Sequence, residues 1–279
     1  MGGAIAGFWH GDVALMRETS EHALRDGLVR QTSCYPLIPY SNRIAHGRFS
    51  FDGIEHRLAL NFGDHPHSIH GNAWQKPWQV AEADGTHCRL VLVHRPEGGE
   101  ARGWPFAYRA EQLLTLSPNG LTLTLSLKSE DHRAMPAGLG LHPFFPKRSG
   151  VRLQFAAERV YPSGSDSLPM DGIPVPAGWS YRSMRELGEP RLDNCFAGWD
   201  GKARIVYDQE KIALRVDADP LFGHLVVYVP HGRDFFAVEP VSHLNNAINR
   251  PDLTGHGLKV LKPGERVTAQ VRFDVEALS

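Results

Sequence analysis

The sequence of 279 residues predicts an all-β protein, a mainly antiparallel β-sandwich or barrel, from two observations. First, short segments in which apolar and polar residues alternate follow one another along the chain, with no helix of crossover length between them. Second, twenty-eight glycines and twenty prolines are spread evenly, as the turns between many short strands require. No linker or change of composition marks a boundary, so we expect residues 1–279 to form a single domain.

The clearest strands are expected at residues 121–128 and 267–275. In both segments every second residue is apolar, which places the apolar side chains on one face. The turn Ser117-Pro118-Asn119-Gly120 joins the first strand to residues 106–116 and predicts a hairpin. A second hairpin is expected at residues 48–60, around Asp52-Gly53. Further expected strands, in chain order, are 89–94, 151–155, 203–207, 211–216, 225–229 and 235–238.

One short helix is expected at residues 20–26, with Ser20 as its cap and Gly27 as its stop. Three cysteines, far apart and odd in number, favour reduced thiols over a disulfide framework or a thiolate zinc site. No segment approaches the length of apolar residues that a membrane span requires, and no leader pattern opens the chain. We therefore expect a cytoplasmic protein.

The charge balance argues against two classes of partner. Thirty basic and thirty-one acidic residues give a net charge of -1, so no global basic field would hold a nucleic acid or an anionic membrane. We expect a small or neutral partner instead. Fifteen histidines are the unusual count, and most of them, His56 among them, are expected to be dispersed solvent residues.

Three histidines gather in His65-Pro66-His67-Ser68-Ile69-His70, ahead of Trp74 and Trp78. No HExxH spacing accompanies them. In an extended segment His65 and His67 share a face while His70 points to the other, so we expect no metal site here. The segment favours one functional imidazole beside stacking tryptophans; partly exposed loop histidines are the alternative.

Two further segments place a titratable group in apolar surroundings. His142 precedes Pro143 within Gly138–Pro146, a stretch with almost no other polar residue, and a poised imidazole is favoured there over a core histidine with satisfied hydrogen bonds. Glu239 ends an apolar run and precedes Pro240, which is expected to place its carboxylate at the mouth of a strand. Desolvation there would raise its pKa and suit a general base; an exposed glutamate at a strand end is the alternative.

Two charged residues are candidates for substrate binding. Arg43 follows a segment stiffened by Pro36 and Pro39, and its planar fork suits hydroxyl or carboxylate recognition. The alternative is a loop arginine paired with a surface carboxylate. Asp193 precedes an apolar pair and could instead cap a turn.

Taken in order, these segments resemble the aldose 1-epimerase (galactose mutarotase) family. The resemblance runs from about Cys34 to the C-terminus. The matching text is Asn42-Arg43-Ile44, Ile69-His70-Gly71, Leu141-His142-Pro143-Phe144-Phe145, Asp193 to Phe196, Val238-Glu239-Pro240, Asn249, Gly257-Leu258 and Leu261-Lys262-Pro263-Gly264-Glu265.

The resemblance implies an all-β supersandwich of the galactose mutarotase type with a sugar-binding cleft, acting without a cofactor on the α and β anomers of a free aldose. By position, Glu239 would be the general base, His142 the general acid and His70 a second histidine near the ring oxygen. Arg43 and Asp193 would hold sugar hydroxyls. The adjoining Asn42 and Trp74 are also expected to bind substrate. No metal ligand is implied.

The match also implies that the usual first N-terminal strand is missing here. Either Met1 is an internal start, or one sheet has an exposed edge that a loop or a second copy of the chain, in a homodimer, would cover.

Three alternatives to this activity stay open at the level of sequence. A hexose 6-phosphate could be the substrate, if Arg43, Arg48 or Lys76 met its phosphate. The protein could bind carbohydrate without catalysis. A glycosidase pairing Glu239 with Asp193 is the third alternative.

Overall fold

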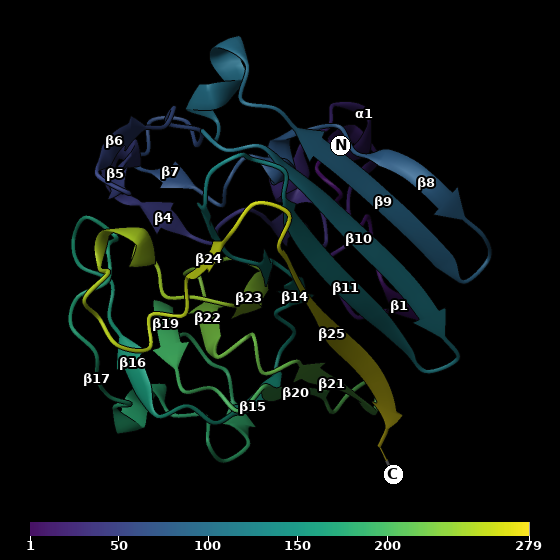
Figure 1. The fold of residues 1–279 in the computed structure, drawn as a ribbon. Coiled ribbons are helices and arrows are strands. Elements are labelled where there is room, and N and C mark those ends of the chain that lie inside the picture. The colour runs from purple at the N-terminus through teal and green to yellow at the C-terminus, as the bar shows by residue number, and fades with distance from the viewer. Residues whose placement is uncertain (279) are drawn as a thin grey trace.

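The computed structural model describes residues 1–278, and two large antiparallel sheets form most of it (Figure 1). The prediction of an all-β antiparallel sandwich is confirmed. The first sheet has nine strands, in the spatial order β18 (Arg185–Glu186), β15 (Arg152–Phe155), β20 (Lys202–Tyr207), β21 (Ile212–Ala218), β25 (Arg266–Ala277), β11 (Gly120–Ser129), β10 (Tyr108–Ser117), β9 (His87–His94) and β8 (Gln79–Ala83).

The second sheet has eight strands and lies in the lower left part of Figure 1. Its spatial order is β17 (Ile173–Pro174), β16 (Arg159–Tyr161), β19 (Asp193–Ala197), β22 (His224–Tyr228), β23 (Phe235–Val241), β13 (Gly140–Leu141) and β3 (Pro36–Leu37), and β14 (Phe144–Pro146) also pairs with β23.

Short ribbons and turns complete the chain. The two-stranded ribbons are β1 (Trp9–His10) with β2 (Val13–Ala14), β4 (Arg43–Ile44) with β7 (Ser68–Ile69), β5 (Arg48–Phe51) with β6 (Ile54–Arg57), and β12 (Met135–Ala137) with β24 (Lys259–Leu261). The 3-10 turns are η1 (Val29–Gln31), η2 (Ala45–Gly47), η3 (Ala73–Gln75), η4 (Gly98–Arg102), η5 (Ala177–Trp179) and η6 (Ala247–Asn249).

The one α-helix in the described part of the chain, α1 (Glu21–Arg25), begins where the sequence predicts. The hydroxyl of Ser20 accepts a hydrogen bond from the backbone N–H of Ala23 at 3.2 Å and so caps the helix. Within residues 1–278 there is no helix with the length and apolar character needed to cross a membrane.

Both predicted hairpins are confirmed. Strands β10 and β11 pair continuously from Tyr108 opposite Ser129 to Ser117 opposite Gly120. Strands β5 and β6 pair across the turn at Asp52-Gly53. The alternating C-terminal segment is β25, which lies between β11 and β21 in the first sheet.

The main core lies between the two sheets. The alternate leucines of β11 and the apolar face of β25 supply one side, and alternate residues of β22 and β23 supply the other. The buried residues that meet there include Leu121, Leu123, Leu125, Leu127, Val271, Phe273, Leu225, Val227, Phe236 and Val238.

Alternation along β23 also explains on which face of the sheet Glu239 lies. Phe236 and Val238 point into the core between the sheets, so Ala237, Glu239 and Val241 point to the opposite face of the second sheet. The N-terminal segments that contain Tyr35 and Trp74 pack over this opposite face.

Glu239 does not stand at the mouth of a strand, which corrects the sequence prediction. β23 continues through Pro240 to Val241. β23 can include Pro240 because the neighbouring strand is interrupted between β13 and β14. No residue of that strand pairs with Pro240, so no backbone N–H is needed there. The edge strand β8 is exposed at all five residues.

Candidate active site

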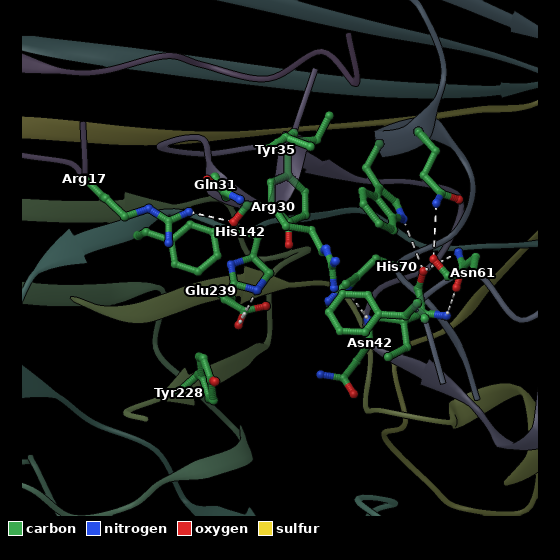
Figure 2. Close-up of a pocket in the computed structure, with 18 of the residues that line it drawn as sticks. Arg17, Arg30, Gln31, Tyr35, Asn42, Asn61, His70, His142, Tyr228 and Glu239 are labelled. Carbon is green, nitrogen blue, oxygen red and sulfur yellow. Dashed lines mark hydrogen bonds and ion pairs between the residues drawn. The ribbon is translucent and has the colours of Figure 1, made fainter. Parts of the chain in front are cut away.

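A cavity of about 640 Å³ opens on the covered face of the second sheet (Figure 2). Strands β19, β22 and β23 form its floor, and the N-terminal segments form its walls. All seven residues that the sequence predicts for the site line this cavity: Asn42, Arg43, His70, Trp74, His142, Asp193 and Glu239.

His142 and Glu239 are brought together by strand register. Phe144 pairs with Ala237 on β23, and Gly140 pairs with Val241 in the same register, so His142 stands directly opposite Glu239. Nε2 of His142 lies 3.4 Å from Oε1 of Glu239, the contact that Figure 2 draws as a dashed line. The pairing of two neighbouring strand segments thus produces a carboxyl and an imidazole side by side.

Both groups are almost fully buried, at 7% and 2% exposure for His142 and Glu239. Burial raises the pKa of Glu239 well above its usual value, and Asp193 adds to this shift by repulsion while Arg43 opposes it. Burial also lowers the pKa of His142 to about 3, and the positive charge of Arg17 pushes it in the same direction. Burial therefore favours the uncharged form of each group, a protonated carboxyl beside a neutral imidazole, with one ionisable proton between them.

The pair leaves two polar atoms without partners. Nδ1 of His142 and Oε2 of Glu239 are buried and make no hydrogen bond within residues 1–278. Such atoms are costly unless something satisfies them. Both belong to residues that line the cavity, so a ligand hydroxyl placed there could satisfy them.

His70 is fixed in orientation and tautomer. It follows β7 with a φ of 64°, a left-handed conformation that is uncommon for a residue with a side chain. The backbone N–H of Asn42 donates to Nδ1 of His70 at 3.0 Å. Burial, with smaller effects from His142 and Arg43, lowers the pKa of His70 well below its usual value. The imidazole is therefore neutral with its proton on Nε2, which makes it a fixed hydrogen-bond donor.

Arg43, on β4, is held by three partners. Its Nη1 donates to Oδ1 of Asn42 at 3.1 Å, its Nη2 to Oδ2 of Asp193 at 3.2 Å, and its Nε to Nε2 of His65 at 3.4 Å. Asp193 begins β19 and stands opposite Tyr228 of β22. The sequence left open a surface ion pair for Arg43 and a turn cap for Asp193; instead the two residues pair with each other at the wall of the cavity.

Aromatic rings form another wall. Trp74, in η3, stacks with Tyr35 at a ring separation of 5.8 Å, and its Nε1 donates to the carbonyls of Ile69 and Gly71. Tyr35 in turn packs on the His142 ring at 4.9 Å, and Phe144 stacks on that imidazole at 4.3 Å. Flat apolar surface beside polar groups is what a sugar ring, with its apolar and hydroxyl faces, requires.

Other sequence candidates lie outside this cavity. Trp78 is absent from its lining, as are His65 and His67. The rings of His65 and His67 lie 5.2 Å apart, in keeping with the shared face that the sequence predicts. No group of three metal-ligating side chains gathers in the part of the chain that the structure describes.

The basic residues named with Arg43 for a phosphate also lie elsewhere. Arg48 is exposed on β5, and Lys76 pairs with Glu100. Neither lines the cavity. Two arginines that sequence reasoning missed, Arg17 and Arg30, do line it.

Tyr228 and Tyr35 were missed too, although each carried a signal. Tyr228 is the residue opposite Asp193 on the neighbouring strand, so alternation along the predicted strand 225–229 could have placed it on the same face. Tyr35 opens the same proline-rich segment that leads to Arg43. Arg17 and Arg30 carried no such signal, because they lie in segments without periodicity.

Comparison with known proteins agrees with this geometry. A family model described as aldose 1-epimerase matches residues 1–274. The chain belongs to the aldose 1-epimerase family. The family membership that the sequence motifs imply is thereby confirmed, and with it the assignment to the isomerase class of enzymes.

Individual members of the aldose 1-epimerase family resemble the chain along most of its length. An uncharacterised Escherichia coli protein, YphB, is 32% identical over 99% of this chain and 94% of its own. The crystal structure of an Escherichia coli K12 protein described as a candidate aldose 1-epimerase superposes with a TM-score of 0.90 at 30% identity, covering 99% of this chain and 94% of that one. Bovine galactose mutarotase is 25% identical over 61% of this chain and 51% of its own.

Proposed function

We propose that the protein is an aldose 1-epimerase that interconverts the α and β anomers of a hexose, with Glu239 and His142 moving the protons. The observation that supports this most is the 3.4 Å contact between Nε2 of His142 and Oε1 of Glu239 in the wall of a cavity of about 640 Å³.

Opening a cyclic hemiacetal needs a base and an acid at neighbouring points. The proton of the C1 hydroxyl must leave while the ring oxygen gains one, and both oxygens are bonded to the same carbon. A base and an acid that serve them must therefore lie side by side. Adjacent positions on paired strand segments supply that arrangement for Glu239 and His142.

The single proton of the pair suffices for the whole cycle. Transfer of the Glu239 proton to His142 gives a carboxylate and an imidazolium. The carboxylate then takes the proton of the C1 hydroxyl, the imidazolium gives its proton to the ring oxygen, and the C1–O bond to that oxygen breaks. Glu239 is again protonated and His142 neutral, so the enzyme is ready to run the reverse transfers on the open aldehyde. Rotation at C1 before closure gives the other anomer.

The remaining residues bind and orient the sugar. The Nε2–H of His70 can donate to the ring oxygen or a hydroxyl next to it, since its ring lies 5.3 Å from that of His142. Asp193 can accept a hydroxyl proton while Arg43 holds its other side. Trp74 and Tyr35 offer the apolar surface for one face of the ring.

Polarimetry tests this proposal directly. Freshly dissolved α-anomers of a panel of neutral and anionic aldoses are followed with and without the protein, in a buffer that catalyses mutarotation only weakly. We expect at least one sugar to reach equilibrium faster in proportion to protein concentration. Binding of a sugar without acceleration of any aldose would instead indicate a carbohydrate-binding protein and contradict the proposal.

A further inference from the structure

We propose that the aldose accepted by this pocket carries an oxyanion, a phosphate or a carboxylate, in its exocyclic C6 group, and that Arg17 binds it while Arg30 attracts it at the rim. This inference rests on the proposed function, because it specifies the substrate class of the same site. The inference is supported by the presence in the cavity of two arginines, Arg17 and Arg30, that have no acidic partner within residues 1–278.

Arg17 is a half-buried cation with no anion beside it. Its Nη2 donates to the carbonyl oxygens of Arg30 at 2.8 Å and Thr32 at 2.6 Å. Its Cζ lies 3.8 Å above the ring of Phe144. No carboxylate within residues 1–278 lies within 4.0 Å of the Arg17 guanidinium, the limit for an ion pair. The carboxylate of Asp234 raises the pKa of Arg17 only from farther away.

The Arg17 guanidinium is fixed in the cavity wall although burial disfavours its charge. Burial without a counter-ion is unfavourable for a guanidinium and lowers the pKa of Arg17 to about 10, which still leaves it charged at neutral pH. The two backbone hydrogen bonds and the Phe144 ring fix the side chain in place before any ligand arrives. A fixed, unpaired guanidinium in the wall of a cavity suits an oxyanion.

The position of Arg17 relative to His142 indicates which part of the sugar it meets. The Arg17 guanidinium lies 3.8 Å from the centre of the Phe144 ring, and the same ring stacks on the His142 imidazole at 4.3 Å. Figure 2 shows Arg17 on the side of His142 that is remote from His70. In a hexopyranose the carbon that carries the exocyclic group is bonded to the ring oxygen. If His142 protonates that oxygen, the exocyclic group lies near Arg17.

Arg30 adds a second unpaired charge. Its side chain is exposed, and its Cζ lies 4.3 Å above the ring of Phe62 at the other end of the aromatic wall. No carboxylate within the described residues forms an ion pair with it. Because Arg43 is already paired with Asp193, Arg17 and Arg30 give the cavity an excess of positive charge in a chain whose net charge is -1. Such a local field draws in anionic substrates.

Anomer exchange at equilibrium, measured by NMR, tests the inference on the intact protein. The sugars are D-glucose, D-glucose 6-phosphate and D-glucuronate at constant ionic strength. We expect kcat/KM for at least one anionic sugar to exceed that for glucose by about tenfold or more. Comparing the phosphate with the carboxylate shows which oxyanion the site accepts.

Variants assign the preference to the arginines. Arg17→Gln should lower the ratio of anionic to neutral kcat/KM by about tenfold, and Arg17→Lys by less, because lysine keeps the charge but not the fork. Arg30→Gln should lower the ratio by a smaller factor and weaken its dependence on salt. Arg25→Gln is the matched control, since Arg25 is an exposed residue of α1 beside Asp26. Should Arg17→Gln fail to fold, the exposed Arg30 still provides the test.

The outcomes separate the two proposals. If neutral glucose is converted as efficiently as both anionic sugars, and the ratio is unchanged in Arg17→Gln and Arg30→Gln, the anion site is wrong while the epimerase stands. If no aldose is accelerated, the epimerase proposal fails. In that case calorimetric titration with D-glucose 6-phosphate still decides on the anion site, because its binding should be lost in Arg17→Gln and Arg30→Gln if the site exists.

Discussion

His142 and Glu239 face each other because the strand beside β23 is interrupted without a change of register. Gly140 and Phe144 keep the same alignment with β23 on either side of the break, and Pro143 and Pro240 fall within it. The break frees the imidazole and the carboxyl from a regular ladder while the strands fix their separation at 3.4 Å. The paired strand segments hold the two side chains rigidly, as the proposed proton transfer requires.

His70→Asn tests the role of the second histidine. Asparagine tolerates a φ of 64°, so the fold should keep its melting temperature, but the shorter side chain no longer places a donor beside His142. We expect kcat/KM for anomer exchange to fall by about ten- to a hundredfold. His70→Val provides the comparison: it should lose activity and also melt earlier, because a β-branched residue resists this backbone conformation. Full activity in His70→Asn would show that the imidazole takes no part.

Arg43→Lys tests the three-way network of the guanidinium. Lysine keeps the charge but cannot bond Asn42, His65 and Asp193 together, so Asp193 loses its fixed position. KM should rise by about tenfold, with a smaller change in kcat. The control is Arg57→Lys on the exposed side of β6, which should change neither constant. An unaltered KM in Arg43→Lys would mean that the network does not hold the sugar.

Gly71→Ala tests how tightly the His70 loop is packed. A Cβ at residue 71 would come within 2.1 Å of the carbonyl oxygen of Ile38, at a φ of +71°. We expect the free energy of unfolding to fall by about 3 kcal/mol or more, and activity to fall with it, since His70 is the preceding residue. Gly53→Ala has a similar φ of +73° but open space around it, so it should lose only about 1 kcal/mol. Equal losses in urea unfolding would contradict the packing argument.

Buried histidines should make the protein sensitive to mild acid. Burial lowers the pKa of His224 and of His243 from the usual 6.5 of histidine to about 4. Between these values the unfolded chain binds protons that the folded chain does not, so stability is full above pH 6.5 and is lost as the pH falls toward 4. Each residue should contribute of order 1–3 kcal/mol to this loss. Glu239 acts in the opposite direction, because its raised pKa favours the unfolded chain as the pH rises above 4.5.

Urea unfolding at pH 7.5 and pH 5 measures this effect. The free energy of unfolding should be smaller at pH 5, and the difference between the two pH values should shrink in His224→Gln. The exposed His10→Gln is the control and should keep the wild-type difference. A difference that is the same in His224→Gln and in the wild type would rule out His224 as a source.

The parts of the fold that depend on neighbouring residues could be predicted from the sequence. The hairpin of β10 and β11 follows from alternation and a turn of four residues, and Ser20 caps α1 for similarly local reasons. Pairings across long distances could not be predicted. His56, expected in solvent, is only 9% exposed, because β5 pairs it with Phe49 and the two rings stack at 4.9 Å.

The same distinction applies to the site. His142 and Glu239 were predictable as candidates because each is a titratable residue in an apolar stretch before a proline. Their direct contact depends on the register between segments about a hundred residues apart, which no local pattern encodes. Arg17 is the extreme case. It reaches the cavity only because its side chain bonds the carbonyls of residues 30 and 32, and nothing around it in the sequence indicates a site.

Anomer exchange in Glu239→Gln is the most direct test of the central claim that this carboxyl and His142 move the protons. Glutamine keeps the shape of the side chain but cannot take a proton, so kcat should fall by about 10²–10⁴-fold while the melting temperature is maintained. Glu55→Gln, at an exposed position of β6, is the matched control and should behave as the wild type. A Glu239→Gln protein that folds and keeps a kcat within a few fold of the wild type would contradict the account.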